Sequence, residues 1–266
     1  MVNKTAIEWV IFVLFAVFIS LTLCQGQVAA FKESPQVEQL VNEGKLPPLE
    51  QRLPKQPAVV TPVDRPGTYG GIWRRAYTGL SDLVGARRIL YDPLVRWSTD
   101  YKVVPNLAYK WEIDQEGRVF IFYLIPGVRW SDGHPFTADD ILFYMEDIVL
   151  NKELTPTIPK WLSPTGNPPK VAKIDDYTVR FEFDQPYSLF VQQLACPQGM
   201  NFVTKPKHYL KSFHKKYADP QELQRLIEQK KASTWEKLFL DMSDVQRAMF
   251  VNPEMPSILL EGRYKG

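Results

Sequence analysis

The chain has little cysteine. Only Cys24 and Cys196 occur among its 266 residues, and the first lies in an N-terminal segment that we expect to be removed. A mature protein with one thiol cannot form an intramolecular disulfide, which excludes a disulfide-stapled secreted scaffold. Because 45% of the residues are hydrophobic, the chain is instead long and apolar enough to be stabilised by a packed core.

The sequence also has no large excess of either charge, few histidines and no phosphate-binding loop. The net charge is +2 with acids and bases interspersed, so no nucleic-acid-binding surface is indicated. His208 and His214 are six residues apart and fall on different faces of a helix, which argues against a metal pair. "TYGGIW" lacks the spacing and lysine of a phosphate loop, and no cofactor is indicated.

A catalytic group is equally hard to find. Cys196 with a histidine would be the one nucleophilic pair available, but "LACPQGM" provides no recognisable nucleophile context. The acidic pairs 139–140 and 175–176 are sequence neighbours that do not face each other, and helix capping and turn chemistry account for them. We therefore expect a protein that is not an enzyme and has no catalytic residues, and we keep an exported hydrolase as the less favoured alternative.

The N-terminus reads as a targeting segment. Lys4 precedes the apolar run from Trp9 to Cys24, which is shorter than the about 20 residues of a spanning helix. Val28-Ala29-Ala30 is a small-residue cleavage site, so residues 1–30 are predicted to be a signal peptide cut after Ala30. An uncleaved anchor is the alternative. Lipidation of Cys24 is a third reading, although Leu23 stands where a lipoprotein box needs a small residue.

The remainder divides into a tether and a globular part of mixed α and β structure (α+β). Residues 31–66 are rich in proline and are predicted to be a linker. Hairpins are predicted around the turn at 114–117 and between 170–174 and 177–183. The strand at 119–124 is apolar on both faces, so we expect both faces to be covered.

Helix starts are well marked. Thr137 with Asp140 forms a capping box before an apolar face. Asp219-Pro220 opens a second helix, and Ser233 with Glu236 opens a third through another capping box. Trp97 and the other tryptophans are expected to lie mostly in the core, with one or two aromatic side chains, such as Tyr77, lining a ligand cleft.

A longer pattern resembles a known family. The matching segments are Tyr91 to Val95, Pro105 to Glu112, Gly117, Leu124 to Gly133 and Pro135 to Ile141. Together they are similar to the signature of the family 5 extracellular solute-binding proteins, the oligopeptide, dipeptide and nickel receptors of ABC importers. The resemblance covers residues 67–266.

The resemblance implies an exported periplasmic or cell-envelope receptor, a monomer, that delivers a small solute, a peptide first of all, to ABC permease subunits. It implies the N-terminal part of a two-lobed fold in which residues 67–266 form an incomplete N-terminal lobe and the second lobe is missing. A truncated, non-functional fragment is therefore an alternative, and weak solute affinity is expected for the chain alone. By position, Tyr77, Leu80, Ser81 and Asp82 match the loop that contacts ligand in relatives; an ordinary surface loop is the competing interpretation.

Overall fold

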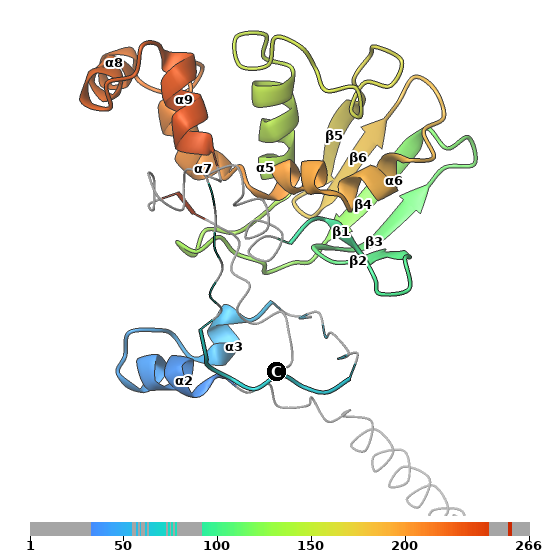
Figure 1. Cartoon of the computed structure of the whole chain (residues 1–266). Helices are drawn as coiled ribbons and strands as arrows, with labels where there is room; N and C mark the ends of the chain where they lie inside the picture. Colours follow the sequence, from blue (N-terminus) through green and yellow to red (C-terminus); the bar gives the residue numbers. More distant parts are fainter. Residues whose placement is uncertain are drawn as a thin grey trace, which may run out of the picture.

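The computed structural model describes residues 33–54, 64–72 and 92–244, together with positions 57, 59, 62, 74, 76, 78, 255 and 256. At its centre is a four-stranded antiparallel sheet in the order β3-β4-β6-β5 (Figure 1). Its strands are β3 (Ala108–Ile113), β4 (Val119–Leu124), β5 (Lys170–Asp175) and β6 (Thr178–Glu182). Both predicted hairpins are thus present, and β6 of the second pairs with β4 of the first.

The first hairpin closes through side-chain hydrogen bonds at its turn. The Asp114 carboxylate accepts the backbone N–H groups of Arg118 at 2.8 Å and Val119 at 3.0 Å. Those bonds, led by the one from Val119, hold the pKa of Asp114 below its ordinary value. Gly117 has φ +69, a conformation that a residue without Cβ adopts at little cost. The turn predicted at 114–117 is confirmed.

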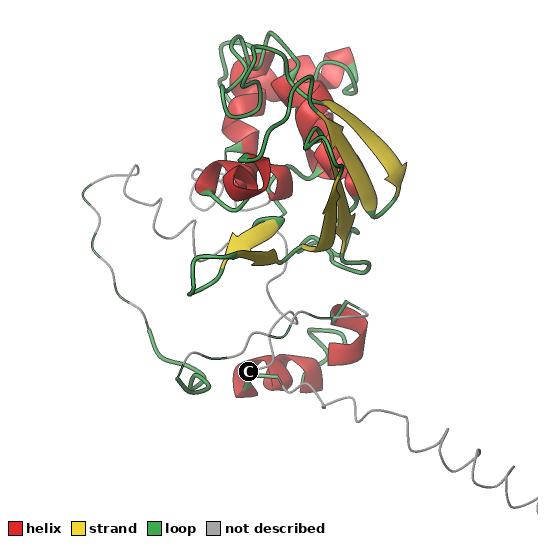
Figure 2. Ribbon diagram, turned by 90° about the vertical axis from the view of Figure 1, so that its right-hand side faces the viewer, coloured by secondary structure: helices red, strands yellow, loops and turns green. Residues whose placement is uncertain are grey.

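One face of the sheet carries the core. Phe120, Phe122 and Phe181 are fully buried there, and they converge on Phe190 of α6 (Phe190–Leu194), whose ring centroid lies 5.1 Å from that of Phe120 and 5.3 Å from that of Phe181. Figure 2 shows the helices that follow β4 in the chain gathered on one side of the strands. Tilted and edge-on aromatic pairs of this kind add to the stabilisation from burial itself.

The opposite face of β4 corrects a prediction. Val119, Ile121 and Tyr123 are only half-buried, alternating with the buried residues along the strand. Ile121 lies between Glu112 of β3 and Arg180 of β6 in the register, so the stems of long charged side chains flank it and no second layer of described residues covers it. An apolar residue on a strand can thus be sheltered by its cross-strand neighbours alone.

The helix predicted after Thr137 is present in two parts. α5 (Ala138–Phe143) is α-helical and η2 (Tyr144–Val149) is a π-helix. The Thr137 hydroxyl accepts the N–H of Asp139 at 3.3 Å, and Asp140 accepts the N–H of Thr137 at 3.0 Å. The predicted capping box is confirmed. So is the apolar face, since Ile141, Met145, Ile148 and Val149 are buried and Leu142 is partly buried against the core.

Short helices make up the rest of the described C-terminal region. They are η3 (Pro197–Val203), α7 (Lys207–Leu210), η4 (Lys211–Phe213), α8 (Pro220–Gln229) and α9 (Trp235–Ser243). Asp219 caps α8 as predicted, accepting the N–H groups of Gln221 and Glu222.

The start of α9 was predicted one residue too early. Its cap is Thr234, whose hydroxyl accepts the N–H of Lys237 at 3.3 Å, and not Ser233. This register buries Trp235, Leu238 and Phe239 together, so tertiary packing places the cap at Thr234, although serine is on average the better N-cap.

Two further features lie before the sheet. β1 (Val95–Trp97) and β2 (Val103–Pro105) form a two-stranded ribbon. Within the predicted linker, residues 35–42 and 49–52 form the helices α2 (Pro35–Asn42) and α3 (Leu49–Arg52), which the proline-rich composition did not predict. No helix in the described part of the chain is long and apolar enough to cross a membrane.

Candidate functional site

The residues predicted to contact ligand, Tyr77, Leu80, Ser81 and Asp82, lie outside the described residues, as do the signal segment and Cys24. Described structure resumes at Asp92, which is the first residue of a segment leading into β1. The candidate site is therefore built from the residues that follow the predicted ligand loop along the chain.

A cavity of about 430 Å³ opens between β1 and the junction of α6 with η3. Two stretches of chain about a hundred residues apart form it. Its described lining residues are Asp92, Pro93, Arg96, Trp97, Ala195, Cys196, Pro197 and Met200. This volume lies within the range of about 300–1,000 Å³ typical of small-molecule sites.

Hydrogen bonds to the start of the sheet position the β1 wall. The buried Asn106 side chain donates to the carbonyl of Pro93 at 2.8 Å, and the N–H of Ala108 donates to the carbonyl of Leu94 at 2.8 Å. β2 holds the outer end of the wall, since Trp97 pairs with Val103. Arg96 and Trp97 are thus carried on backbone that is anchored on both sides.

The chemistry of the lining is mixed. Trp97 is 42% exposed, which differs from the core position expected for most tryptophans. Its ring offers a flat apolar surface beside the guanidinium of Arg96 and the carboxylate of Asp92, while Pro197 and Met200 supply apolar area. An aromatic surface flanked by groups of both charges can bind an uncharged ring or a zwitterionic chain.

Cys196 lines the same cavity as a free, half-buried thiol. None of the other described lining residues is a histidine. His208 instead lies 2.6 Å from Asp132, and His214 lies 3.0 Å from the carbonyl oxygen of Asp147. The geometry therefore places both histidines with other partners.

Sequence reasoning missed one histidine pair. The rings of His134 and His208 stack with centroids 3.9 Å apart and planes 8° from parallel. Partial burial pushes the pKa of Asp132 up, but the N–H of His134 and the ring of His208 outweigh it and leave that pKa below its ordinary value. Among the described residues no group of three histidine, cysteine, aspartate or glutamate side chains is arranged to hold a metal ion. His134 and His208 are 74 residues apart in the sequence, so no local pattern predicts that their rings stack.

Known proteins similar to this chain are binding proteins. The Periplasmic alpha-galactoside-binding protein of Rhizobium meliloti is 34% identical over 202 residues, covering 68% of this chain and 29% of that protein. Di/tripeptide-binding protein 1 of Pseudomonas aeruginosa is 27% identical over 145 residues, covering 49% of this chain and 27% of that protein.

Solved structures agree on the fold. An oligopeptide-binding protein OppA superposes with a TM-score of 0.78 at 42% identity, covering 89% of this chain and 36% of that one. The periplasmic binding protein MelB of Agrobacterium fabrum C58, in complex with stachyose, gives a TM-score of 0.55 at 25% identity, covering 86% and 35%. The chain thus spans about a third of the length of these relatives.

The family signature itself covers the sheet and most of the helices described above. Residues 102–236 match the family of bacterial extracellular solute-binding proteins, family 5, in its middle region, and this range runs from β2 to the first turn of α9. The resemblance seen in the sequence is confirmed over half of the chain. The chain belongs to the family 5 bacterial extracellular solute-binding proteins.

Proposed function

We propose that this protein is the substrate-binding component of an ABC importer, exported to the periplasm or cell envelope, where it captures a small solute and delivers it to the membrane permease. The observation that carries the proposal is the cavity beside β1, where Trp97 and Arg96 face a 430 Å³ space on the scaffold of a solute-binding family. It works by binding, without chemical change of the solute.

A short peptide is the first solute class. A peptide presents a carboxylate, an ammonium group and backbone amides, and Arg96 and Asp92 offer a charged partner for each end group. Pro197 and Met200 provide apolar contact for side chains of varied shape, as methionine-containing surfaces do. The 42% identity to an oligopeptide-binding protein supports this class.

A galacto-oligosaccharide is the second class, and specific observations favour it. The Rhizobium meliloti relative is an alpha-galactoside-binding protein, and MelB was solved with stachyose. The exposed face of Trp97 suits the apolar face of a sugar ring, and both charged groups can hydrogen-bond hydroxyls.

Capture is proposed to act through a conformational equilibrium. A solute that contacts the β1 wall more closely in a closed state shifts the population towards that state, by as much as its affinities for the two states differ. The closed, loaded form is then the one that the permease accepts.

The test is a titration of the protein followed by NMR through the indole N–H signals of its tryptophans. A tripeptide and stachyose are added separately up to millimolar concentration, so that weak binding is detected. We expect one of them to shift the Trp97 signal. Trp97→Ala, which has no such signal, is titrated with the same solute by calorimetry and should bind it about tenfold more weakly.

Tyr101→Ala is the matched control, because Tyr101 is an aromatic residue of the β1–β2 connection that is 88% exposed. It should leave the titration unchanged. Shifts of the Trp97 signal by the tripeptide alone establish the peptide class, and shifts by stachyose alone replace it with the sugar class. Absence of any Trp97 shift with both solutes overturns the proposed site.

A further inference from the structure

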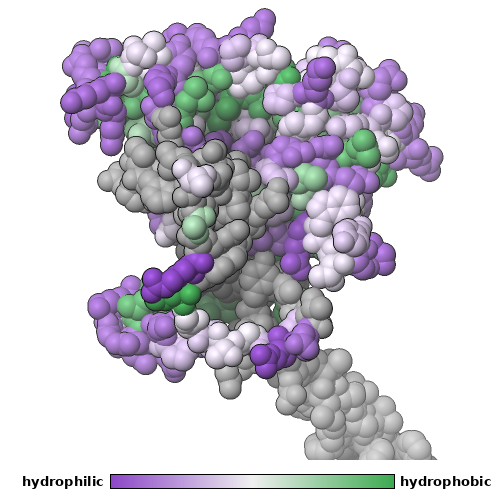
Figure 3. Space-filling model, viewed as in Figure 1, coloured by the Kyte–Doolittle hydropathy of each residue, from purple (hydrophilic) through white to green (hydrophobic). Residues whose placement is uncertain are grey.

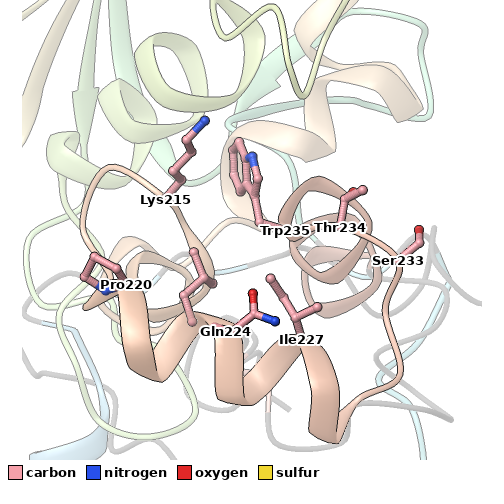
Figure 4. Close-up of a pocket in the computed structure, with 8 residues that line it drawn as sticks. Lys215, Pro220, Gln224, Ile227, Ser233, Thr234 and Trp235 are labelled. Atoms are coloured by element: carbon pink, nitrogen blue, oxygen red, sulfur yellow. The ribbon is translucent and has the colours of Figure 1, made fainter.

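A second cavity lies away from the site proposed above, between α8 and the start of α9 (Figure 4). Its volume is about 510 Å³. Gln224 and Ile227 rise from α8 on one side, and Trp235 and Lys215 face them from the other. Its apolar walls are Leu223, Ile227, Pro220 and the indole of Trp235.

α8 is held at its start and along a narrow buried stripe, which leaves a space beside it. Asp219 fixes the start of the helix, and Leu223 is the one buried residue among the ten residues of α8. Leu226 and Ile227 are only partly buried against the core. Four of the eight lining residues are apolar, and a ligand that displaces water from these apolar walls gains free energy.

A smaller, charged chamber of about 420 Å³ adjoins it, and the two share Lys215 and Trp235. This chamber lies between η2 with the loop that follows it and the segment 214–216 that follows η4. Figure 3 shows hydrophobic side chains in a hollow of the surface. The hollow lies between α8 and α9 on one side and α5 on the other. One ligand can therefore place an apolar body in the larger space and a polar group in the smaller one.

Most charges of the smaller chamber are matched in pairs. Lys215 lies 3.2 Å from both carboxylate oxygens of Glu153, which also accepts the Trp235 Nε1–H at 2.8 Å. Lys216 donates to the buried Asp147 at 2.7 Å. These contacts hold the indole and both lysines in place.

One carboxylate is left over. Among the described residues the side chain of Glu146, which is exposed, makes no ion pair or hydrogen bond. Three carboxylates (Glu146, Asp147 and Glu153) against two ammonium groups (Lys215 and Lys216) leave one net negative charge in the chamber. His214 adds no positive charge near neutral pH, because burial lowers its pKa.

From this arrangement we infer that the paired cavities form a second ligand site, for a small amphipathic amine. Its aromatic or branched apolar body occupies the space between Ile227 and Trp235, and its protonated amino group faces Glu146. The Lys215 ammonium already lies 5.9 Å from the centre of the Trp235 ring, so the indole offers the ligand apolar contact and Glu146 supplies the charge contact. This inference concerns other residues than the solute site and does not depend on it.

Three probes of similar size test the site on the full chain by calorimetry: 2-phenylethylamine, 3-phenylpropionate and 2-phenylethanol. We expect the amine to bind at least about fivefold more tightly than the carboxylate, since an exposed charge contact of about 1 kcal/mol corresponds to about a factor of five. Equal or tighter binding of the carboxylate overturns the inference, as does the absence of binding by all three at millimolar concentration.

Two variants localise the effect. Ile227→Trp fills the apolar space and should abolish amine binding, whereas Gln221→Trp, on an exposed position of the same helix, should leave it unchanged. Glu146→Gln should weaken the binding of the amine by up to about fivefold and leave that of the alcohol unaffected. Circular dichroism and urea unfolding confirm that each variant is folded. Amine binding that survives both Ile227→Trp and Glu146→Gln contradicts the assignment.

Discussion

The carboxylate of Asp140 accepts the backbone N–H of Lys207 at 2.9 Å, joining the start of α5 to the start of α7 across 67 residues of sequence. Its other oxygen accepts the N–H of Thr137 at 3.0 Å and the indole N–H of Trp130 at 3.4 Å. Burial raises the pKa of Asp140 and these three donors oppose that rise without cancelling it. A residue identified as a helix cap is therefore also a tertiary anchor.

Removal of this anchor should cost stability. Asp140→Ala leaves three N–H donors without this acceptor, the buried indole of Trp130 and the half-buried backbone groups of Thr137 and Lys207. We expect it to lower the free energy of unfolding by about 2–4 kcal/mol. Asp140→Asn keeps one acceptor oxygen and should cost less. Asp139→Asn is the control, because Asp139 is a more exposed neighbour paired with Lys173 at 2.6 Å, and such pairs contribute at most about 1 kcal/mol. Urea unfolding measures all three, and equal losses for Asp140→Ala and Asp139→Asn would contradict the anchor role.

His214 should make the protein sensitive to acid. Burial lowers its pKa below the ordinary 6.5, against the opposing effects of the Asp147 carbonyl and carboxylate and of Glu153, while Lys216 lowers it further. As the pH falls below 6.5 the unfolded chain therefore takes up a proton before the folded one does, and the free energy of unfolding decreases until the folded pKa is reached.

A variant without a titrating ring isolates this effect. His214→Phe keeps an aromatic side chain among Trp235 and Phe239 but loses the hydrogen bonds to Asp147 and Lys216. It should be less stable than the wild type at pH 7, and the difference should narrow as the pH falls towards about 5. Tyr217→Phe, which removes a hydroxyl bonded to Asp147 at 2.6 Å, should keep the wild-type slope. Parallel curves for wild type and His214→Phe would refute the prediction.

Gly199 occupies a position with no room for a side chain. A Cβ added there would meet the carbonyl oxygen of Leu194 at 2.0 Å, so Gly199→Ala requires a shift of η3 or α6. We expect a loss of about 1–3 kcal/mol or more in the free energy of unfolding. Gly133→Ala meets open space but has φ +87, and should cost about 1 kcal/mol.

Gly67→Ala completes this comparison. Gly67 has open space around the position of a Cβ and no positive φ. The substitution should therefore change the free energy of unfolding by no more than about 0.5 kcal/mol. Thermal or urea unfolding of the three variants should reproduce the order Gly199, Gly133, Gly67. A tolerated Gly199→Ala would show that α6 and η3 are separated more widely than the structure has them.

Local chemistry made much of the fold predictable. The caps at Thr137 and Asp219 and the turn closed by Asp114 depend on hydrogen bonds that span a few residues, so their signals stand next to one another in the sequence. The exposed face of β4 was not predictable in this way, because the shelter of Ile121 comes from Glu112 and Arg180 on other strands.

The candidate sites depended less on local signals. Trp97 was predicted to lie in the core with most tryptophans, because the residue type alone does not show whether an indole is buried or exposed. Asp92 and Arg96 meet Cys196 and Met200 only through the approach of β1 to the α6–η3 junction. The loop that includes Tyr77 and Asp82 remains a prediction, because it lies outside the described residues.

By itself, the sequence determined the order of hairpins and helices, where most of them begin, and the motifs shared with a solute-binding family, since each depends on backbone geometry and on contacts between near neighbours. Only the tertiary structure decided which face of the sheet is covered, where α9 begins, and which side chains meet around the two candidate cavities. Those outcomes depend on the packing of segments far apart in the chain. A pattern of neighbouring residues does not show which distant segments come into contact.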